Sequence, residues 1–247
     1  MDAAEEKGIP KVNDFNKGDN FGCGYFQVTE QNGLRCSAAV GYLNPIKKRS
    51  NLKIEINSHV QKINFDGTKA ISVTYWKNNK LNTIQANKEI LLSSGSIGST
   101  QILQTSGIGN PKKLRELGVN ITKELKGVGQ NLQDHLMFRP VYKIQNIKSL
   151  NKKINSLFGN FLIGLEFIFN RSGPMTMGAS QLCLFAKSDL SRETPNLQFH
   201  VQPLSLDKFG DPLHDFPGLT ASVCNLNPQS RGKVHITSKD YKTAPSI

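Results

Sequence analysis

The chain contains 247 residues, of which 37% are hydrophobic and 20% charged, a composition that excludes a disordered or a collagen-like protein. Its most apolar segment, residues 158–169, contains Asn160 and Glu166 and is shorter than the roughly 20 apolar residues of a bilayer span, so no transmembrane segment is expected. The formal net charge is +12, but the basic residues form short pairs without interleaved aromatic residues, which favours a lysine-rich surface over a nucleic-acid interface.

The first third of the chain predicts loops followed by a small antiparallel sheet. Residues 1–50 are rich in Gly and Asn, with a short strand expected at 25–29 and a helical turn at 37–43 that ends before Pro45. From residue 51 to 86 apolar and polar residues alternate, with turn residues at 66–67 and 78–79. We therefore predict a β-meander in this segment.

A different pattern follows in residues 88–118. The apolar run Lys88–Ser94 ends in small residues, which predicts a buried parallel strand that enters a tight turn. A helix is expected at 99–105, with Ser99 as its N-cap and Gly107 as its end, and a second helix at 111–117. This order places a helix N-terminus near the carboxyl end of the strand, where anionic cofactors bind in α/β folds.

The C-terminal half predicts a second domain that begins at about Met137. Residues 151–169 form a helix candidate, residues 170–178 form a Gly/Pro loop, and strands are expected at 197–201, 219–226 and 233–237. The predicted fold class is therefore mixed α/β, with an α/β region followed by an antiparallel sheet.

Several motifs with well-defined chemistry are absent from the sequence. The G-x-G pairs at 22–24 and 127–129 lack the third glycine of the dinucleotide fingerprint, and the sequence contains neither a P-loop nor a G-x-S-x-G elbow. The four cysteines form no C-x-x-C pair, so we expect reduced, mostly buried thiols, and neither Cys nor His spacing predicts a metal site.

One stretch of the sequence matches a known family signature. Residues 95–109, GSIGSTQILQTSGIG, closely resemble the second signature of the glucose–methanol–choline (GMC) flavin oxidoreductases, with Thr100 where the family usually has Pro or Ser. Further similar segments follow the family's order along nearly the whole chain, at 32–39, 50–60, 88–95, 114–118, 127–135 and 230–234. Residues 171–234 are most similar to the bacterial alcohol and choline dehydrogenase branch of the family.

The resemblance implies FAD as cofactor and a division into two regions. Residues 1–136 would be part of the FAD-binding region, and residues 137–247 would belong to the antiparallel-sheet substrate region. Family members also carry an N-terminal G-x-G-x-x-G unit and a C-terminal segment with the active-site His. Because this sequence contains neither, we expect a central fragment of a longer protein and assign no catalytic residue within it.

Three residues are candidates for cofactor contact on the basis of the resemblance. Val60 ends a strand whose backbone holds the adenine in the family, and its alternative role is that of a core valine. Ser94 and Gly95 follow the predicted buried strand, where small residues allow a ribose or phosphate to approach, and their alternative role is that of a tight turn. His135 lies in a motif that the family uses structurally, so it is a weak candidate for a general base.

The remaining polar candidates stay undecided between structural and functional roles. Asn131 and Asp134 are expected to hold their loop by bonds to the backbone. Gln198, His200 and Gln202 alternate with apolar residues, so their face would be either solvated or part of a substrate cavity.

The function implied by the resemblance is oxidation of an alcohol CH–OH group by hydride transfer to flavin in the full-length protein. Its partners would be a small alcohol and an electron acceptor, either oxygen or a quinone; the sequence does not identify which alcohol. The expected location is cytoplasmic, with peripheral attachment to the inner membrane left open. The alternatives are a basic, non-catalytic polyanion-binding module and a degenerate family member, and the 247-residue chain alone is expected to be inactive and to bind FAD weakly or not at all.

Overall fold

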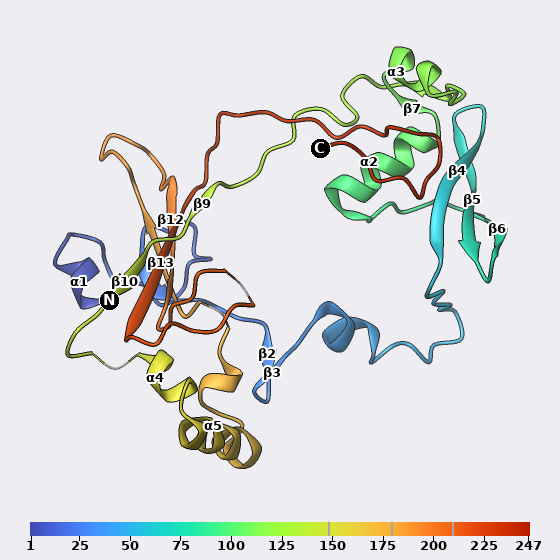
Figure 1. The fold of residues 1–247 in the computed structure, drawn as a ribbon. Helices are drawn as coiled ribbons and strands as arrows, with labels where there is room; N and C mark the ends of the chain where they lie inside the picture. Colours follow the sequence, from blue (N-terminus) through green and yellow to red (C-terminus); the bar gives the residue numbers. More distant parts are fainter. Residues whose placement is uncertain (148, 179, 209) are drawn as a thin grey trace. The chain divides into compact units, whose positions relative to one another are not determined.

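A computed structural model describes residues 1–147, 149–178, 180–208 and 210–247 (Figure 1). The chain divides into two compact units, and both are discontinuous in sequence. The first unit comprises residues 1–52 and 135–228, and the second comprises residues 53–134 and 229–247. The chain enters the second unit after residue 52, returns to the first at residue 135 and leaves it again after residue 228. Residues 1–52 therefore belong with residues 135–228, and the division at residue 136 into a cofactor region and a substrate region stays a prediction.

The first unit contains a six-stranded antiparallel sheet in the order β1-β11-β12-β13-β10, with β9 also paired to β13. The six strands are β1 (Gly22–Tyr25), β9 (Met137–Phe138), β10 (Val141–Lys143), β11 (Leu182–Ala186), β12 (Leu197–Gln202) and β13 (Gly218–Asn225). In β13 buried residues alternate with partly exposed ones, as expected for a strand with one covered face. The strands predicted at 197–201 and 219–226 are confirmed.

The sheet also includes a strand from the N-terminal loop region. The sequence alone did not predict that this strand joins the sheet. Strand β1 pairs with β11 and lies three residues before the short strand expected at 25–29. The N-terminal segment lies alongside β1. Val12 donates its N–H to the Cys23 carbonyl at 2.8 Å, and Cys23 donates its N–H to the Pro10 carbonyl at 2.8 Å. A Cβ at Gly24 would overlap the Val12 carbonyl oxygen, so the 22–24 G-x-G pair serves this close approach.

Short elements surround this sheet. Near the N-terminus lie the helix α1 (Asp2–Glu5), the hairpin β2 (Glu30–Gln31) and β3 (Leu34–Arg35), and a π-helical turn η1 (Ala39–Leu43), where a helical turn was predicted. The helix predicted at 151–169 is two helices, α4 (Leu150–Ile154) and α5 (Leu157–Asn170), followed by a 3-10 turn η2 (Pro174–Thr176). The break occurs because Ser156 caps a new helix, its Oγ accepting the Gly159 N–H at 3.3 Å.

The second unit contains the predicted β-meander and two helices. Its three-stranded antiparallel sheet has the order β4 (His59–Asp66), β5 (Lys69–Lys77), β6 (Lys80–Gln85). Asn78 and Asn79 form the two-residue turn between β5 and β6 with φ of 52° and 58°, values that Asn tolerates well. The helices are α2 (Gly95–Thr105) and α3 (Pro111–Glu116), and β7 (Ile108–Gly109) pairs in parallel with β8 (Lys123–Glu124).

Two predicted strands are wrong. Residues 88–94 form no strand, Leu91 is 80% exposed, and no strand in the described part of the chain pairs with them. Residues 233–237 make only an isolated bridge, between His235 and Ser246, and they reach the core of the second unit instead. There Ile236 packs with Leu114 and Val119. An apolar run becomes a strand only where a partner completes its hydrogen bonds, which the run itself does not specify.

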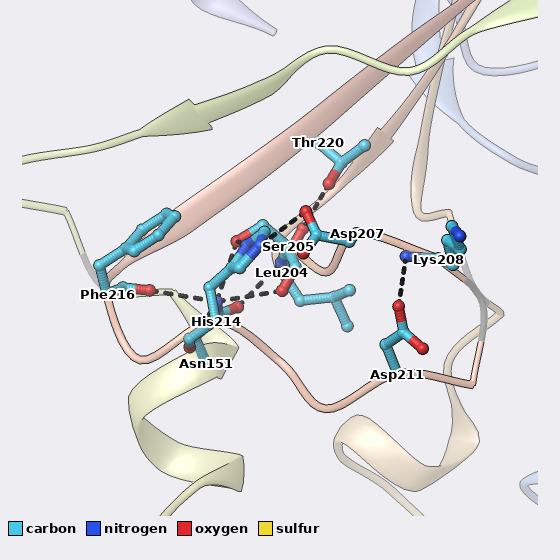
Figure 2. Close-up of polar contacts among 9 residues, drawn as sticks. All are labelled: Asn151, Leu204, Ser205, Asp207, Lys208, Asp211, His214, Phe216 and Thr220. Carbon is cyan, nitrogen blue, oxygen red and sulfur yellow. Dashed lines mark hydrogen bonds and ion pairs between the residues drawn. The ribbon is translucent and has the colours of Figure 1, made fainter.

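The loop at 203–217 in the first unit is held by a buried polar cluster, shown in Figure 2. Asn151 on α4 is fully buried, and its Oδ1 accepts the Ser205 N–H at 2.9 Å. Its Nδ2 lies 2.9 Å from Ser205 Oγ and 3.1 Å from both the His214 and the Phe216 carbonyl oxygens. One amide side chain therefore satisfies backbone groups on both arms of the loop.

Replacing Asn151 with Ala is expected to lower the free energy of unfolding by about 2–4 kcal/mol, because several buried backbone groups would lose their partner. Urea unfolding followed by circular dichroism would measure the change, and hydrogen exchange in β13 would locate it. Asn155→Ala is the matched control, since Asn155 is exposed and binds the same loop at the Leu213 and His214 carbonyls. Equal losses for the two variants would contradict the role assigned to Asn151.

Candidate functional site

Helix α2 is bound to the edge strand of the second unit by two hydroxyl groups. Thr105 Oγ1 donates to the Gln61 carbonyl at 2.9 Å, and Ser106 Oγ accepts the Ile63 N–H at 2.8 Å. Strand β4 pairs with β5 on its other side, so these hydroxyls satisfy backbone groups that an edge strand leaves open. The register shifts between Val60 and Lys62, which marks a bulge at the point of attachment.

This attachment leaves a cavity of about 580 Å³ between the start of β4 and one side of α2. Val60 and Ser94, which are 34 positions apart in the sequence, both line it. Gly95 begins α2 with a φ of +75° and does not line the cavity itself. The structure thus brings two of the three predicted residues to one place, and their contact with a cofactor stays a prediction.

The start of α2 differs from the sequence prediction. The helix begins at Gly95, one turn before the expected start at Ser99, and the Ser99 hydroxyl accepts the Ser94 N–H at 3.0 Å from inside the helix. The first turn contains no acidic residue, so the positive end of the helix is not neutralised by a side chain of its own first turn.

Aromatic side chains complete the cavity, and sequence reasoning did not select them. Trp76 lies across from His59 in the β4–β5 ladder, and the ring of Tyr241 packs edge-on against His59 at 5.0 Å. Lys242 places its ammonium 4.3 Å from the centre of the Trp76 ring, a cation–π contact. The hairpin register could have placed Trp76 opposite His59, but no local signal indicated that Tyr241 returns to this sheet.

The C-terminal segment is held on α2 by two glutamines. Gln101 Nε2 donates to the carbonyls of Tyr241 at 3.1 Å and Thr243 at 2.9 Å. Gln104 is 2% exposed, accepts the Ile236 N–H at 2.8 Å and donates to the Val234 carbonyl at 3.1 Å. The position of Tyr241 in the cavity wall therefore depends on side chains of the helix that forms the opposite wall.

The loop at 127–135 packs against the same C-terminal segment. Gly129 has a φ of +80°, and a Cβ there would overlap the Val234 carbonyl oxygen. Leu132 and Gly232 exchange two backbone hydrogen bonds, at 3.0 and 2.8 Å, beside Asn131 in the left-handed region. Backbone contacts therefore hold this loop on the C-terminal segment, and bonds from the Asn131 and Asp134 side chains stay a prediction.

Two histidines of the chain lie in environments that lower their pKa. Burial lowers the pKa of His200, whose ring lies 5.0 Å from that of Phe26. The pKa of His235 is lowered by burial and by the nearby charges of Lys113 and Lys233. His135 is exposed. Within the described residues no group of three or more His, Cys, Asp or Glu side chains could hold a metal ion.

The polar row of β12 is partly buried: Gln198 and His200 are half-buried and Gln202 is buried, and a contact of this row with substrate stays a prediction. Gln202 is buried and donates to Ser180 Oγ at 3.2 Å, while Gln198 lies 3.6 Å from the Cys183 sulfur. Neighbouring strands and loops therefore occupy these side chains.

A Ser–His–Asp sequence of contacts occurs in the first unit, and its burial argues against nucleophilic catalysis. His214 Nδ1 lies 3.0 Å from Ser205 Oγ, and its Nε2 lies 3.2 Å from Asp207 Oδ1 (Figure 2). Ser205 is fully buried and its Oγ already accepts from Asn151, so a substrate cannot reach it. The three groups stabilise the 203–217 loop.

Comparison with known proteins identifies the family. Residues 1–137 match the family model described as GMC oxidoreductase. The chain belongs to the GMC oxidoreductase family. It is 37% identical over its whole length to the oxygen-dependent choline dehydrogenase of Vibrio vulnificus and 35% identical to that of Photobacterium profundum. The chain spans 44% and 43% of the length of these two GMC relatives.

Solved structures agree on the fold. An FAD-dependent oxidoreductase from Chaetomium thermophilum superposes with a TM-score of 0.88 at 24% identity, covering all of this GMC chain and 49% of the other. A formate oxidase gives a TM-score of 0.86 at 20% identity. The match covers 98% of this chain and 47% of the formate oxidase chain. The family resemblance and the mixed α/β fold class predicted from the sequence are confirmed.

Replacing Gln104 with Leu is expected to lower the stability of the second unit by about 2–4 kcal/mol, because the Ile236 N–H and the Val234 carbonyl lose their buried partner. Urea unfolding monitored by Trp76, the only tryptophan of the chain, would measure it. Gln130→Leu is the control, since Gln130 is exposed and contacts only the outer nitrogen of His235 among the bonds described. A loss as large in the control would show that the buried amide is not the anchor.

Proposed function

We propose that this chain supplies part of the FAD-binding region and part of the substrate region of an enzyme that oxidises a small alcohol. Residues 1–136 are assigned to the first region and residues 137–247 to the second. Membership of the GMC oxidoreductase family supports the reaction class. The names of the relatives favour choline as the alcohol and oxygen over a quinone as the electron acceptor.

The observation that carries the cofactor assignment is the cavity between β4 and α2. Its volume of about 580 Å³ is within the range of small-ligand pockets, and its walls combine aromatic rings with hydroxyl and amide groups. Trp76 offers a flat apolar face for a purine, while Ser58 and Ser94 offer hydroxyls for a ribose. These residues fit the adenosine part of FAD.

Each part of the site has a separate task in this proposal. Val60 presents strand backbone to the adenine edge, and Ser94 and Gly95 leave space beside the N-terminus of α2, whose dipole favours a nearby phosphate. Gln101 keeps Tyr241 in the wall and so excludes water from the purine. When bound, FAD supplies the hydride acceptor, and we assign no proton-transferring base to any residue of this chain.

The site also limits what this chain can do alone. The third glycine of the dinucleotide fingerprint is missing at 22–24 and at 127–129, and the second glycine of each pair, Gly24 and Gly129, instead packs against backbone. The chain therefore lacks a glycine-rich turn for the pyrophosphate, which contributes much of the anion binding in such sites. A cytoplasmic location is part of the same proposal.

The cavity is expected to bind AMP and FAD weakly and saturably in the 247-residue chain. Trp76 lines the cavity and is the only tryptophan, so its fluorescence reports occupancy directly. Gly98→Leu places a side chain at the cavity wall and should weaken binding about tenfold or more. Ser96→Leu, on an exposed position of the same helix, should leave binding unchanged. Absence of quenching, or equal effects of both variants, would remove the adenosine assignment.

The 247-residue chain mixed with FAD and choline is expected to show no turnover. A missing general base alone costs ~10²–10⁴-fold in rate. Oxygen consumption and dye reduction would be measured together, with choline and a primary alcohol as substrates. Turnover that is abolished by His200→Ala or His135→Ala would contradict the proposal and identify a base within this chain.

A further inference from the structure

The ring of His235 lies between two glutamine side chains of the second unit. Its Nδ1 atom is 3.2 Å from Gln104 Nε2 on α2, and its Nε2 atom is 3.0 Å from Gln130 Nε2 in the loop at 127–135. The histidine side chain is half-buried, and all three residues belong to the same compact unit. A histidine in such contacts changes its hydrogen-bonding role when it gains a proton, and it does so near neutral pH.

The backbone partners of Gln104 fix the direction of its bond to His235. The Ile236 N–H is a donor, so the Gln104 atom that it reaches at 2.8 Å is the amide oxygen. The amide nitrogen then donates one hydrogen to the Val234 carbonyl at 3.1 Å and the other to the histidine ring. Nδ1 of His235 therefore carries a lone pair, and the neutral ring has its hydrogen on Nε2. Gln130 is exposed, so its amide is free to turn its oxygen toward that hydrogen.

Protonation of Nδ1 is incompatible with this arrangement. It would set an N–H of the ring against an N–H of Gln104, two donors whose nitrogens are 3.2 Å apart. Rotation of the Gln104 amide would relieve that contact, but its nitrogen would then face the Ile236 N–H and its oxygen the Val234 carbonyl. Gln104 is 2% exposed, so water does not replace these partners unless the segment moves. The closed arrangement accepts only the neutral ring.

The charges around His235 also disfavour a protonated ring. Burial lowers the pKa of His235, and the positive charges of Lys113 on α3 and Lys233 in its own segment lower it further. Helix α2, which packs against the ring, contains no ionisable side chain. The loop at 127–135 carries its one acidic group at Asp134, which is exposed. The surroundings therefore offer the proton no opposing charge among the groups that act on its pKa.

His235 is linked to the part of the C-terminal segment that carries Tyr241. Its backbone exchanges two hydrogen bonds with Ser246, at 3.0 and 2.8 Å, so the chain between these residues forms a closed loop beside α2 (Figure 1). Gln101 holds this loop through the Tyr241 carbonyl, and residues 243–246 add no ionisable side chain. Movement of His235 away from Gln104 would therefore loosen the loop that forms one wall of the cavity.

We propose that His235 is a pH-sensitive switch that keeps the C-terminal segment on α2 when its ring is neutral and detaches residues 234–236 when the ring is protonated. In the detached state Gln104 loses both backbone partners, and Tyr241 is free to leave the cavity wall. The switch rests on contacts within the second unit and does not depend on what the cavity binds. Its effect on nucleoside binding rests in addition on the proposed function.

Amide hydrogen exchange of the 247-residue chain, followed by NMR, tests the switch. The Ile236 amide donates to Gln104, so its exchange reports detachment directly. Because the detached segment binds the proton more readily than the closed one, detachment should increase several-fold as the pH falls from about 7.5 to about 5.5, after correction for intrinsic exchange. The free energy of unfolding should decline over the same range, since the unfolded chain also binds this proton more readily than the native one.

Two substitutions separate His235 from the other histidine of the second unit, His59. His235→Asn keeps an acceptor oxygen near the Nδ1 position and removes the titrating group, so Ile236 exchange should stay slow and lose its pH dependence. His59→Asn removes the ring that packs against Tyr241 and should leave the pH dependence unchanged. A pH dependence that survives in the first variant, or disappears in the second, would overturn the proposal.

Nitrogen NMR of the imidazole rings decides the question without any variant. At about pH 7.5 the ring of His235 should carry its hydrogen on Nε2. A hydrogen on Nδ1, or a pKa above the ordinary histidine value, would show that the closed segment tolerates the proton and that the switch is wrong.

Adenosine, which carries no group that titrates in this range, is the probe of the cavity. It should bind several-fold more weakly at the lower pH, as measured by Trp76 fluorescence. If Ile236 exchange follows the pH as stated and adenosine binds at neither pH, the switch stands and the adenosine assignment is wrong. If adenosine binds and the Ile236 exchange does not change with pH, the switch is wrong and the assignment stands.

Discussion

The hydrogen-bonding capacity of helix α2 holds the second unit together. Four polar side chains at its C-terminal end reach an edge strand on one side and the C-terminal segment on the other. They belong to Gln101, Gln104 and Thr105 and to the C-cap residue Ser106. Neither of those segments has a complete set of backbone partners without the helix. Because buried backbone groups must be paired, the helix decides where both segments lie. The cavity proposed to take adenosine is the space that this arrangement leaves between α2 and the start of β4.

A similar dependence on one amide group organises the first unit. Asn151 completes the hydrogen bonds of the 203–217 loop, which returns the chain from β12 to β13. The same helix, α4, then presents Lys152 and Lys153 outward, next to the apolar surface of α5. A buried polar anchor thus fixes the position of α4 against this loop. In α4 and α5 a polar side chain, that of Asn151, is buried while several apolar side chains are exposed. This is the reverse of the usual distribution, in which apolar side chains are buried and polar ones exposed.

The two G-x-G pairs show that the role of a short glycine motif depends on what packs against it. Gly24 admits the segment at 10–12 against β1, and Gly129 admits the C-terminal segment at Val234. In both places the missing side chain allows backbone to approach backbone, which is the same property that dinucleotide-binding loops use for a pyrophosphate. The spacing of glycines alone does not distinguish these uses. The order of the surrounding strands and helices distinguishes them. Here that order already argued against a dinucleotide-binding fingerprint.

By itself the sequence determined the family, the β-meander, the helix at Pro111 and the strands around residues 200 and 220, because these depend on local alternation, turn residues and ordered motifs. Family resemblance also selected Val60, Ser94 and Gly95 as candidates for cofactor contact. Only the tertiary structure showed that Val60 and Ser94 line one cavity with Trp76 and Tyr241. It also decided that residues 88–94 form no strand and that residues 1–52 join the sheet of residues 135–228. These features require partners that are far away in the chain, and a strand edge, a buried amide or a cavity wall is defined by such partners and not by its own residues.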